Sequence, residues 1–162
     1  MVAPIVITIL AYLHIISAMA WLGAAVLFVS VIGPGLRSLS PTARLEFLSK
    51  IGPRAIRFFI GSSTATIVFG LGLLYAFPGA SSTTISAGLT LGLIAYLVVI
   101  FVSIPSLRKA DHLANEMLAS GQAGPPSPEL AKALKRGGIG VATVVVLLVI
   151  TLMFMVTAGF PF

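Results

Sequence analysis

The sequence predicts an all-α, polytopic membrane protein in which four transmembrane helices form an antiparallel bundle, a single domain over residues 1–162. Of the 162 residues, 58% are hydrophobic and only 9% are charged, whereas a soluble domain carries about a quarter charged residues. Four apolar stretches reach the length of about 20 residues that a membrane-spanning helix needs. Every formally charged residue lies in one of two segments, Arg37–Arg57 and Arg108–Arg136.

Each apolar stretch should be a helix, because a backbone in lipid has to satisfy its own hydrogen bonds. The first stretch is followed by Gly33-Pro34-Gly35, which predicts a helix stop. The predicted spans, with approximate ends, are Pro4–Ile32, Ile56–Phe77, Ser86–Ile104 and Gly138–Gly159.

Short interfacial helices are predicted in the two charged loops. Ser40-Pro41 resembles an N-cap followed by proline at the first helical position, and it opens a helix to Ile51. Ser127-Pro128 repeats this pattern and opens a helix that leads into the fourth span. The pattern also allows the third span to continue past Pro105 as a polar helix, Leu107–Ser120. The shared cap-then-proline pattern hints at a duplicated two-span unit.

The distribution of lysine and arginine predicts the orientation. All ten lie in or beside the loops that join spans one to two and three to four, and the opposite loop, Pro78–Thr84, has none. The protein is expected in a cell membrane. There the positive-inside rule predicts that both termini lie outside and that both charged loops lie in the cytoplasm. The net charge of +6 suits membrane lipids as partners, while short split loops without a binding motif argue against nucleic acid. The absence of cysteine excludes disulfides and thiolate metal sites.

His14 is the one imidazole in the apolar part of the chain. It lies about 10 residues into the first span, hence about 15 Å from the outer edge, and ionisable residues at such depth usually face the bundle interior. Its helix face also carries Ser17, Ala18, Trp21 and Ala25. Counting the same depth along the other three spans predicts a polar layer of His14, Thr66, Tyr96 and Thr151.

Two interpretations of His14 stay open. It is either a neutral core histidine hydrogen-bonded to Tyr96 or a threonine, or a haem or metal ligand, since neutral imidazole suits Fe, Cu and Zn. A catalytic role as general base is disfavoured, because the spans contain no carboxylate to orient the ring. Methionines are the other soft donors, but Met19 is off the face of His14, and Met153 and Met155 point in different directions.

The motif Leu13-His14-Ile15-Ile16, followed by Trp21-Leu22-Gly23, resembles the opening helix of a broad family of small membrane proteins. That family includes the CopD-like copper-resistance proteins and the HemJ-type protoporphyrinogen oxidases. A second match is Arg54 and Arg57 before a small-residue span that ends Gly70–Leu74. The resemblance covers under half of the chain and implies a four-helix core with His14 as an axial haem b ligand. The lysine of the HemJ-type enzymes is missing from the start of the third span, so protoporphyrinogen oxidation is not implied.

The leading functional hypothesis is a haem b-binding membrane protein with a redox or electron-transfer role. His14 is the ligand, Trp21 and the surface Gly61–Thr66 are pocket walls, and Arg54 and Arg57 pair with the haem propionates. The second hypothesis is a non-catalytic accessory subunit of a larger membrane complex, suggested by short loops and many small residues. The partners we expect are other membrane subunits or a second copy of the chain in a homo-oligomer. Copper handling ranks third. Ion transport is disfavoured, because a single intramembrane histidine provides no path.

Overall fold

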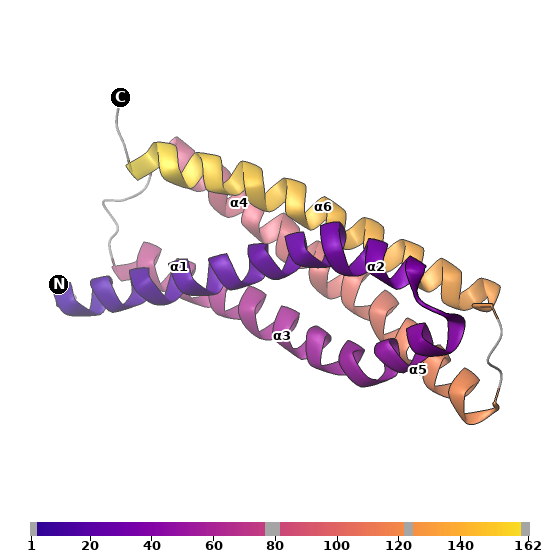
Figure 1. Ribbon diagram of the computed structural model, residues 1–162. Coiled ribbons are helices and arrows are strands. Elements are labelled where there is room, and N and C mark those ends of the chain that lie inside the picture. Colours follow the sequence, from indigo (N-terminus) through magenta and orange to yellow (C-terminus); the bar gives the residue numbers. More distant parts are fainter. Residues whose placement is uncertain (1–2, 77–81, 122–124, 160–162) are drawn as a thin grey trace.

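The structure, a computed structural model, describes residues 3–76, 82–121 and 125–159 (Figure 1). All regular secondary structure in these ranges is helical. In chain order the elements are α1 (Pro4–Leu27), η1 (Phe28–Ile32), α2 (Gly33–Ser38), α3 (Pro41–Ala76), α4 (Thr83–Val98), η3 (Val99–Ser103), α5 (Ile104–Ala119) and α6 (Pro128–Gly159).

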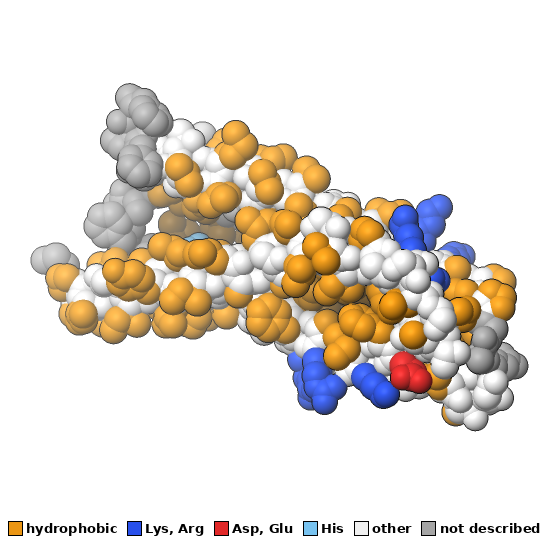
Figure 2. All heavy atoms as spheres, viewed as in Figure 1, with side chains coloured by type: hydrophobic (Ala, Val, Ile, Leu, Met, Phe, Trp, Pro, Cys, Tyr) orange, Lys and Arg blue, Asp and Glu red, His pale blue; other side chains and the backbone are white. Residues whose placement is uncertain are grey.

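These elements form four continuous helical rods, because η1 joins α1 to α2 and η3 joins α4 to α5. Each of the four is long and apolar enough to cross a membrane. The chain is therefore an all-α, multi-pass membrane protein, as its composition predicts. Exposed apolar side chains cover the length of the rods, and the charged side chains gather at one end (Figure 2). We call this the charged end, and the opposite end, where α1 begins and α6 finishes, the uncharged end.

The rods pack as two hairpins. In the uncharged half α1 packs along α3 and α4 packs along α6, while toward the charged end α5 packs against both α3 and α6. Figure 1 shows the α1–α3 pair diverging from the α4–α6 pair toward the uncharged end. The two hairpins therefore lie together at the charged end and spread apart at the other.

The predicted helix stop at Gly33-Pro34 is wrong, because the helix accommodates the proline by widening one turn. The five residues of η1 are π-helical, and the Gly33 N–H donates to the Phe28 carbonyl five residues back. Before Pro105 the Ile104 N–H likewise donates to the Val99 carbonyl. A proline ring clashes with the carbonyl four residues back in a regular helix, and a π turn relieves that clash. The first and third spans therefore each contain a π-helical turn just before a proline. The predicted extension of the third span past Pro105 is confirmed.

The short interfacial helices are not separate elements. Ser40 does cap a helix, since its Oγ accepts from the Ala43 N–H at 3.3 Å, but that helix is α3, which runs through Pro53 for 36 residues. A rod of that length measures about 54 Å, so it extends well beyond a hydrocarbon core of about 30 Å. At the charged end the extensions of α3, α5 and α6 bury a core of their own, formed by Leu45, Leu48, Ala110, Ala114, Met117, Leu130 and Ala133.

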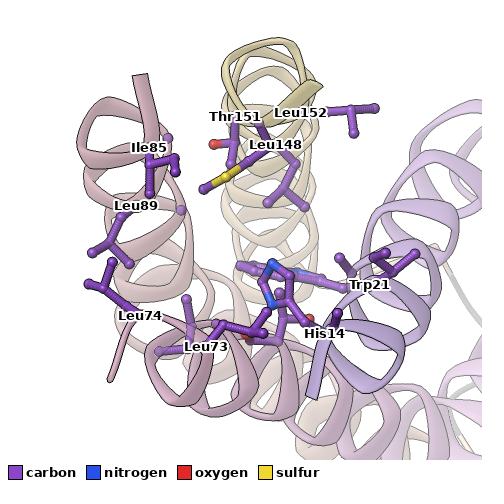
Figure 3. Close-up of a pocket in the computed structure, with 18 of the residues that line it drawn as sticks. His14, Trp21, Leu73, Leu74, Ile85, Leu89, Leu148, Thr151 and Leu152 are labelled. Carbon is purple, nitrogen blue, oxygen red and sulfur yellow. The ribbon is translucent and has the colours of Figure 1, made fainter. Parts of the chain in front are cut away.

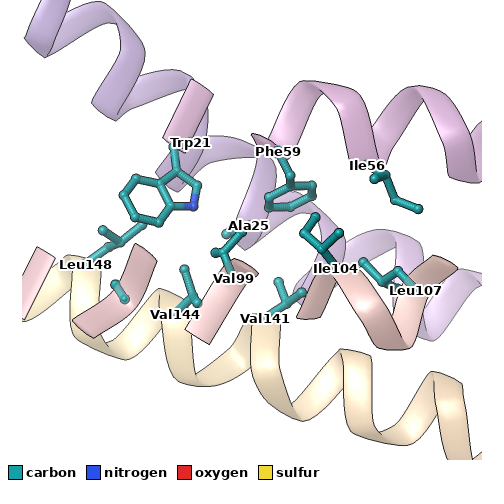
Figure 4. Packing of buried hydrophobic residues seen from close by; sticks show 11 residues of the cluster. Trp21, Ala25, Ile56, Phe59, Val99, Ile104, Leu107, Val141, Val144 and Leu148 are labelled. Atoms are coloured by element: carbon teal, nitrogen blue, oxygen red, sulfur yellow. The ribbon is translucent and has the colours of Figure 1, made fainter. Parts of the chain in front are cut away.

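The principal core lies in the middle of the bundle. Trp21 and Ala25 of α1, Phe59 of α3, and Val144 and Leu148 of α6 belong to one buried cluster (Figure 4). The rings of Phe28 and Phe59 add an edge-on contact at 6.2 Å between centroids. This cluster holds the two hairpins together on the charged-end side of the point where they diverge.

A candidate ligand site around His14

His14 is anchored to the backbone of α3. Its Nδ1 lies 2.9 Å from the carbonyl oxygen of Thr66. Because a carbonyl oxygen can only accept, Nδ1 carries the proton, so in a neutral ring the free lone pair is on Nε2. The predicted hydrogen bond to a side-chain hydroxyl is therefore replaced by one to the main chain. The Thr66 hydroxyl itself donates to the Ser62 carbonyl at 2.8 Å.

Gly70 makes room for the imidazole. A Cβ atom added to Gly70 lies only 2.9 Å from Cε1 of His14 and 3.1 Å from Nδ1, closer than real Cβ contacts. The ring therefore lies directly against the α3 backbone one turn after Thr66. Within residues 3–76, 82–121 and 125–159, Nε2 has no hydrogen-bond partner in the protein.

The imidazole borders a cavity of about 650 Å³ between the two hairpins, in the uncharged half of the bundle (Figure 3). Figure 2 shows the opening as a hollow beside α1. All four rods contribute to the walls, which are almost entirely apolar. Of the lining residues in the described chain, only His14, Thr66, Thr151 and Trp21 carry a polar side-chain atom, and none has a formal charge.

The polar groups of the cavity act mainly as acceptors. The hydroxyls of Thr66 and Thr151 donate to carbonyls of their own helices, the latter to Leu147 at 2.8 Å. Their oxygens and Nε2 of His14 therefore offer lone pairs rather than protons. Such a lining suits a metal centre or a ligand hydroxyl, and it gives no support to an anion.

Trp21 closes the cavity toward the charged end. The indole is fully buried and belongs to the principal core as well as to the cavity wall (Figure 4). Its Nε1 has no hydrogen-bond partner among the described residues. The Trp21 side chain therefore separates the cavity from the principal core, which lies toward the charged end.

The structure brings His14, Trp21 and Thr66 of the predicted site together at the cavity, and Thr151 of the predicted polar layer also lines it. Tyr96 is not at the cavity. Its hydroxyl pairs with Oγ1 of Thr64 at 3.1 Å and links α3 to α4. Thr64 precedes Thr66 by two residues, a rotation of about 200° around the helix, so it lies on another face of α3.

Arg54 and Arg57 are not brought to the cavity either. Both are exposed near the charged end, and the Arg54 guanidinium donates to the Lys50 carbonyl at 2.5 Å. They precede Thr66 by twelve and nine residues, about 18 and 14 Å along the helix axis. The principal core fills the space between.

Two methionines that were not predicted as site residues, Met19 and Met155, line the cavity. Met153 and Met155 do point in different directions, as predicted: Met153 is 65% exposed on the outer surface, while Met155 faces inward. Residue spacing could have predicted that Met155 lines the cavity, because it follows Thr151 by four residues and Leu148 by seven and so lies on the same face of α6.

No three His, Cys, Asp or Glu side chains come together as a metal site in the part of the chain that the structure describes. Besides His14, the donor atoms at the cavity that a metal could use are the thioethers of Met19 and Met155 and the hydroxyls of Thr66 and Thr151.

A comparison with models of known protein families finds no match to this chain, and searches of curated proteins and of solved structures find none either.

Proposed function

We propose that this protein binds haem b in the cavity through Nε2 of His14 and serves a redox role in a cell membrane. The observation that carries the proposal is the placement of the imidazole: Nδ1–H donates to the Thr66 carbonyl, and the ring borders a large apolar cavity. Metal-binding histidines commonly donate their second ring N–H to a backbone carbonyl, which fixes the tautomer and the ring orientation.

The cavity suits the group in size and chemistry. Its volume of about 650 Å³ lies within the range of about 300–1,000 Å³ typical of cofactor pockets. A porphyrin supplies four nitrogen ligands itself, so one histidine is sufficient. When bound, haem supplies one-electron chemistry, and the protein tunes it through the axial ligands and the apolar surroundings.

The haem carboxylates find no cationic partner in the described cavity wall. Burial of an unpaired carboxylate in apolar surroundings is costly, and the placement of Arg54 and Arg57 does not support their predicted role. The haem carboxylates would therefore reach water or lipid head groups at the uncharged end. With the positive-inside rule, this is the outer side of the membrane.

The test is an absorption spectrum of the mildly solubilised protein, oxidised and then dithionite-reduced. The expected result is a Soret band with sharp α and β bands on reduction, and loss of the haem in His14→Ala. His112→Ala is the matched control, since His112 has an exposed side chain that pairs with Glu116 at the charged end. Full haem occupancy in His14→Ala contradicts the proposal.

A second candidate function, an accessory subunit of a membrane complex, is favoured by two glycines. Gly23 and Gly61 are exposed, and a Cβ added at either meets nothing within 4 Å. Packing within this chain therefore does not explain them, whereas close approach of a partner helix does. Stoichiometric co-purification with another membrane protein, without haem, supports this function over the first.

Copper handling, the third prediction, gains thioether donors, because Met19 and Met155 line the same cavity as His14. Thioether and imidazole suit copper in its reduced state. Copper bound in equimolar amount to haem-free protein supports this reading.

A further inference from the structure

His14 and Met155 lie at the same depth on opposite sides of the cavity. Trp21 of α1 and Leu148 of α6 pack together in the principal core, and Figure 4 shows them side by side. From this contact the cavity extends toward the uncharged end. His14 precedes Trp21 by seven residues on one helix, and Met155 follows Leu148 by seven on the other. Because α1 and α6 are antiparallel, both residues lie about 10 Å beyond the contact.

Both residues also lie on the helix faces that point toward each other across the cavity. Seven residues are nearly two full turns at 3.6 residues a turn, so His14 shares the face of Trp21 and Met155 shares the face of Leu148. All four side chains line the cavity. The imidazole and the thioether therefore approach the space between the hairpins from opposite walls.

Each of the two side chains is seated on a glycine of the neighbouring helix. Met155 packs on Gly88 of α4, where an added Cβ lies 2.8 Å from Cε of the methionine and 3.4 Å from its sulfur. His14 packs on Gly70 of α3 in the corresponding way. Each hairpin thus presents one donor, supported from behind by backbone.

We propose that Met155 is the second axial ligand of the iron, opposite His14. This inference rests on the proposed haem function. Thioether sulfur is a soft ligand for transition metals, and it has little other polar use, because it is only a weak hydrogen-bond acceptor. A haem held by both side chains would supply electron transfer rather than substrate chemistry, because the protein itself would occupy the coordination positions that a substrate needs. Histidine–methionine ligation also raises the reduction potential of a haem.

The experiment compares Met155→Leu with Met153→Leu in the haem-loaded protein. Leucine nearly conserves the volume of methionine, and Met153 is the matched control because it is exposed on the outer surface of the same helix. The expected wild-type spectrum is six-coordinate and low-spin. Met155→Leu should retain haem, become five-coordinate and high-spin, and show a lower midpoint potential, while Met153→Leu should match the wild type. Met155→His should restore a low-spin spectrum.

The outcomes separate this inference from the function on which it rests. A haem-loaded wild type that is already five-coordinate and high-spin overturns the role of Met155 and leaves the haem function standing. An unchanged spectrum and potential in Met155→Leu do the same. A wild type that binds no haem overturns both.

Discussion

At the scale of single residues, the state of His14 is set by the main chain. Its proton is directed to the Thr66 carbonyl at 2.9 Å, an acceptor that no residue-type pattern can reveal, since every residue carries one. Rise counting does predict the depth of His14, Thr66 and Thr151, and all three line the cavity. The partner atom depends on how α1 rotates against α3.

Gly70→Ala should displace the imidazole. The added Cβ lies 2.9 Å from Cε1 of a planar ring that cannot bend away, so either His14 or the α1–α3 contact has to shift. We expect a loss of about 1–3 kcal/mol in stability, as for other overpacked sites, together with reduced haem occupancy. Thermal unfolding in detergent and the Soret absorbance measure the two effects.

Gly72→Ala is the matched control for this substitution. Its added Cβ meets the Leu10 side chain at 3.5 Å, an ordinary van der Waals distance, so both readouts should stay close to the wild type. Equal losses in the two variants would indicate a general effect of alanine in α3 rather than the contact with His14.

At the scale of elements, paired helices rather than isolated spans determine which residues meet. The sequence locates four apolar stretches and both cap-then-proline helix starts. It does not show that the helix over residues 41–51 and the second span form one continuous helix, because Gly52-Pro53 between them has the composition of a break. Packing decides otherwise: Leu45 and Leu48 are buried against α5 and α6, and this burial favours a continuous helix through Pro53.

Tyr96→Phe tests the link between α3 and α4. The substitution removes the hydrogen bond to Thr64, and intramembrane hydrogen bonds of this kind contribute about 0.6 kcal/mol on average. We expect a small loss of stability, measured by unfolding in detergent, and an unchanged haem spectrum, because Tyr96 does not line the cavity. A shifted Soret band in Tyr96→Phe would instead support the predicted role of this residue at the haem.

At the scale of the whole molecule, the cavity follows from the divergence of the two hairpins. The principal core and the core at the charged end hold the rods together over most of their length. Toward the uncharged end the α1–α3 and α4–α6 pairs separate (Figure 1). Gly70 and Gly88 then let His14 and Met155 occupy the walls of the resulting space.

Single-cysteine labelling tests the orientation of the molecule, because the natural chain has no cysteine. Thr83→Cys lies near the start of α4 at the uncharged end, and Thr42→Cys lies near the start of α3 at the charged end; both threonines are exposed. The positive-inside rule predicts that an impermeant thiol reagent labels the first in intact cells, and the second only after the membrane is opened. The reverse pattern would place the cavity on the cytoplasmic side.

The sequence by itself determines the class of the protein, the number of its spans and the depth of its polar residues. These properties depend on hydrophobic length and on a constant rise per residue, both of which are local. Only the tertiary structure decides that Thr66 faces His14 while Tyr96 turns to Thr64, and that Met155 lines the cavity while Met153 does not. The physical reason is that rotation and divergence of helices in lipid are set by side-chain packing between them, which residue spacing along one helix does not specify.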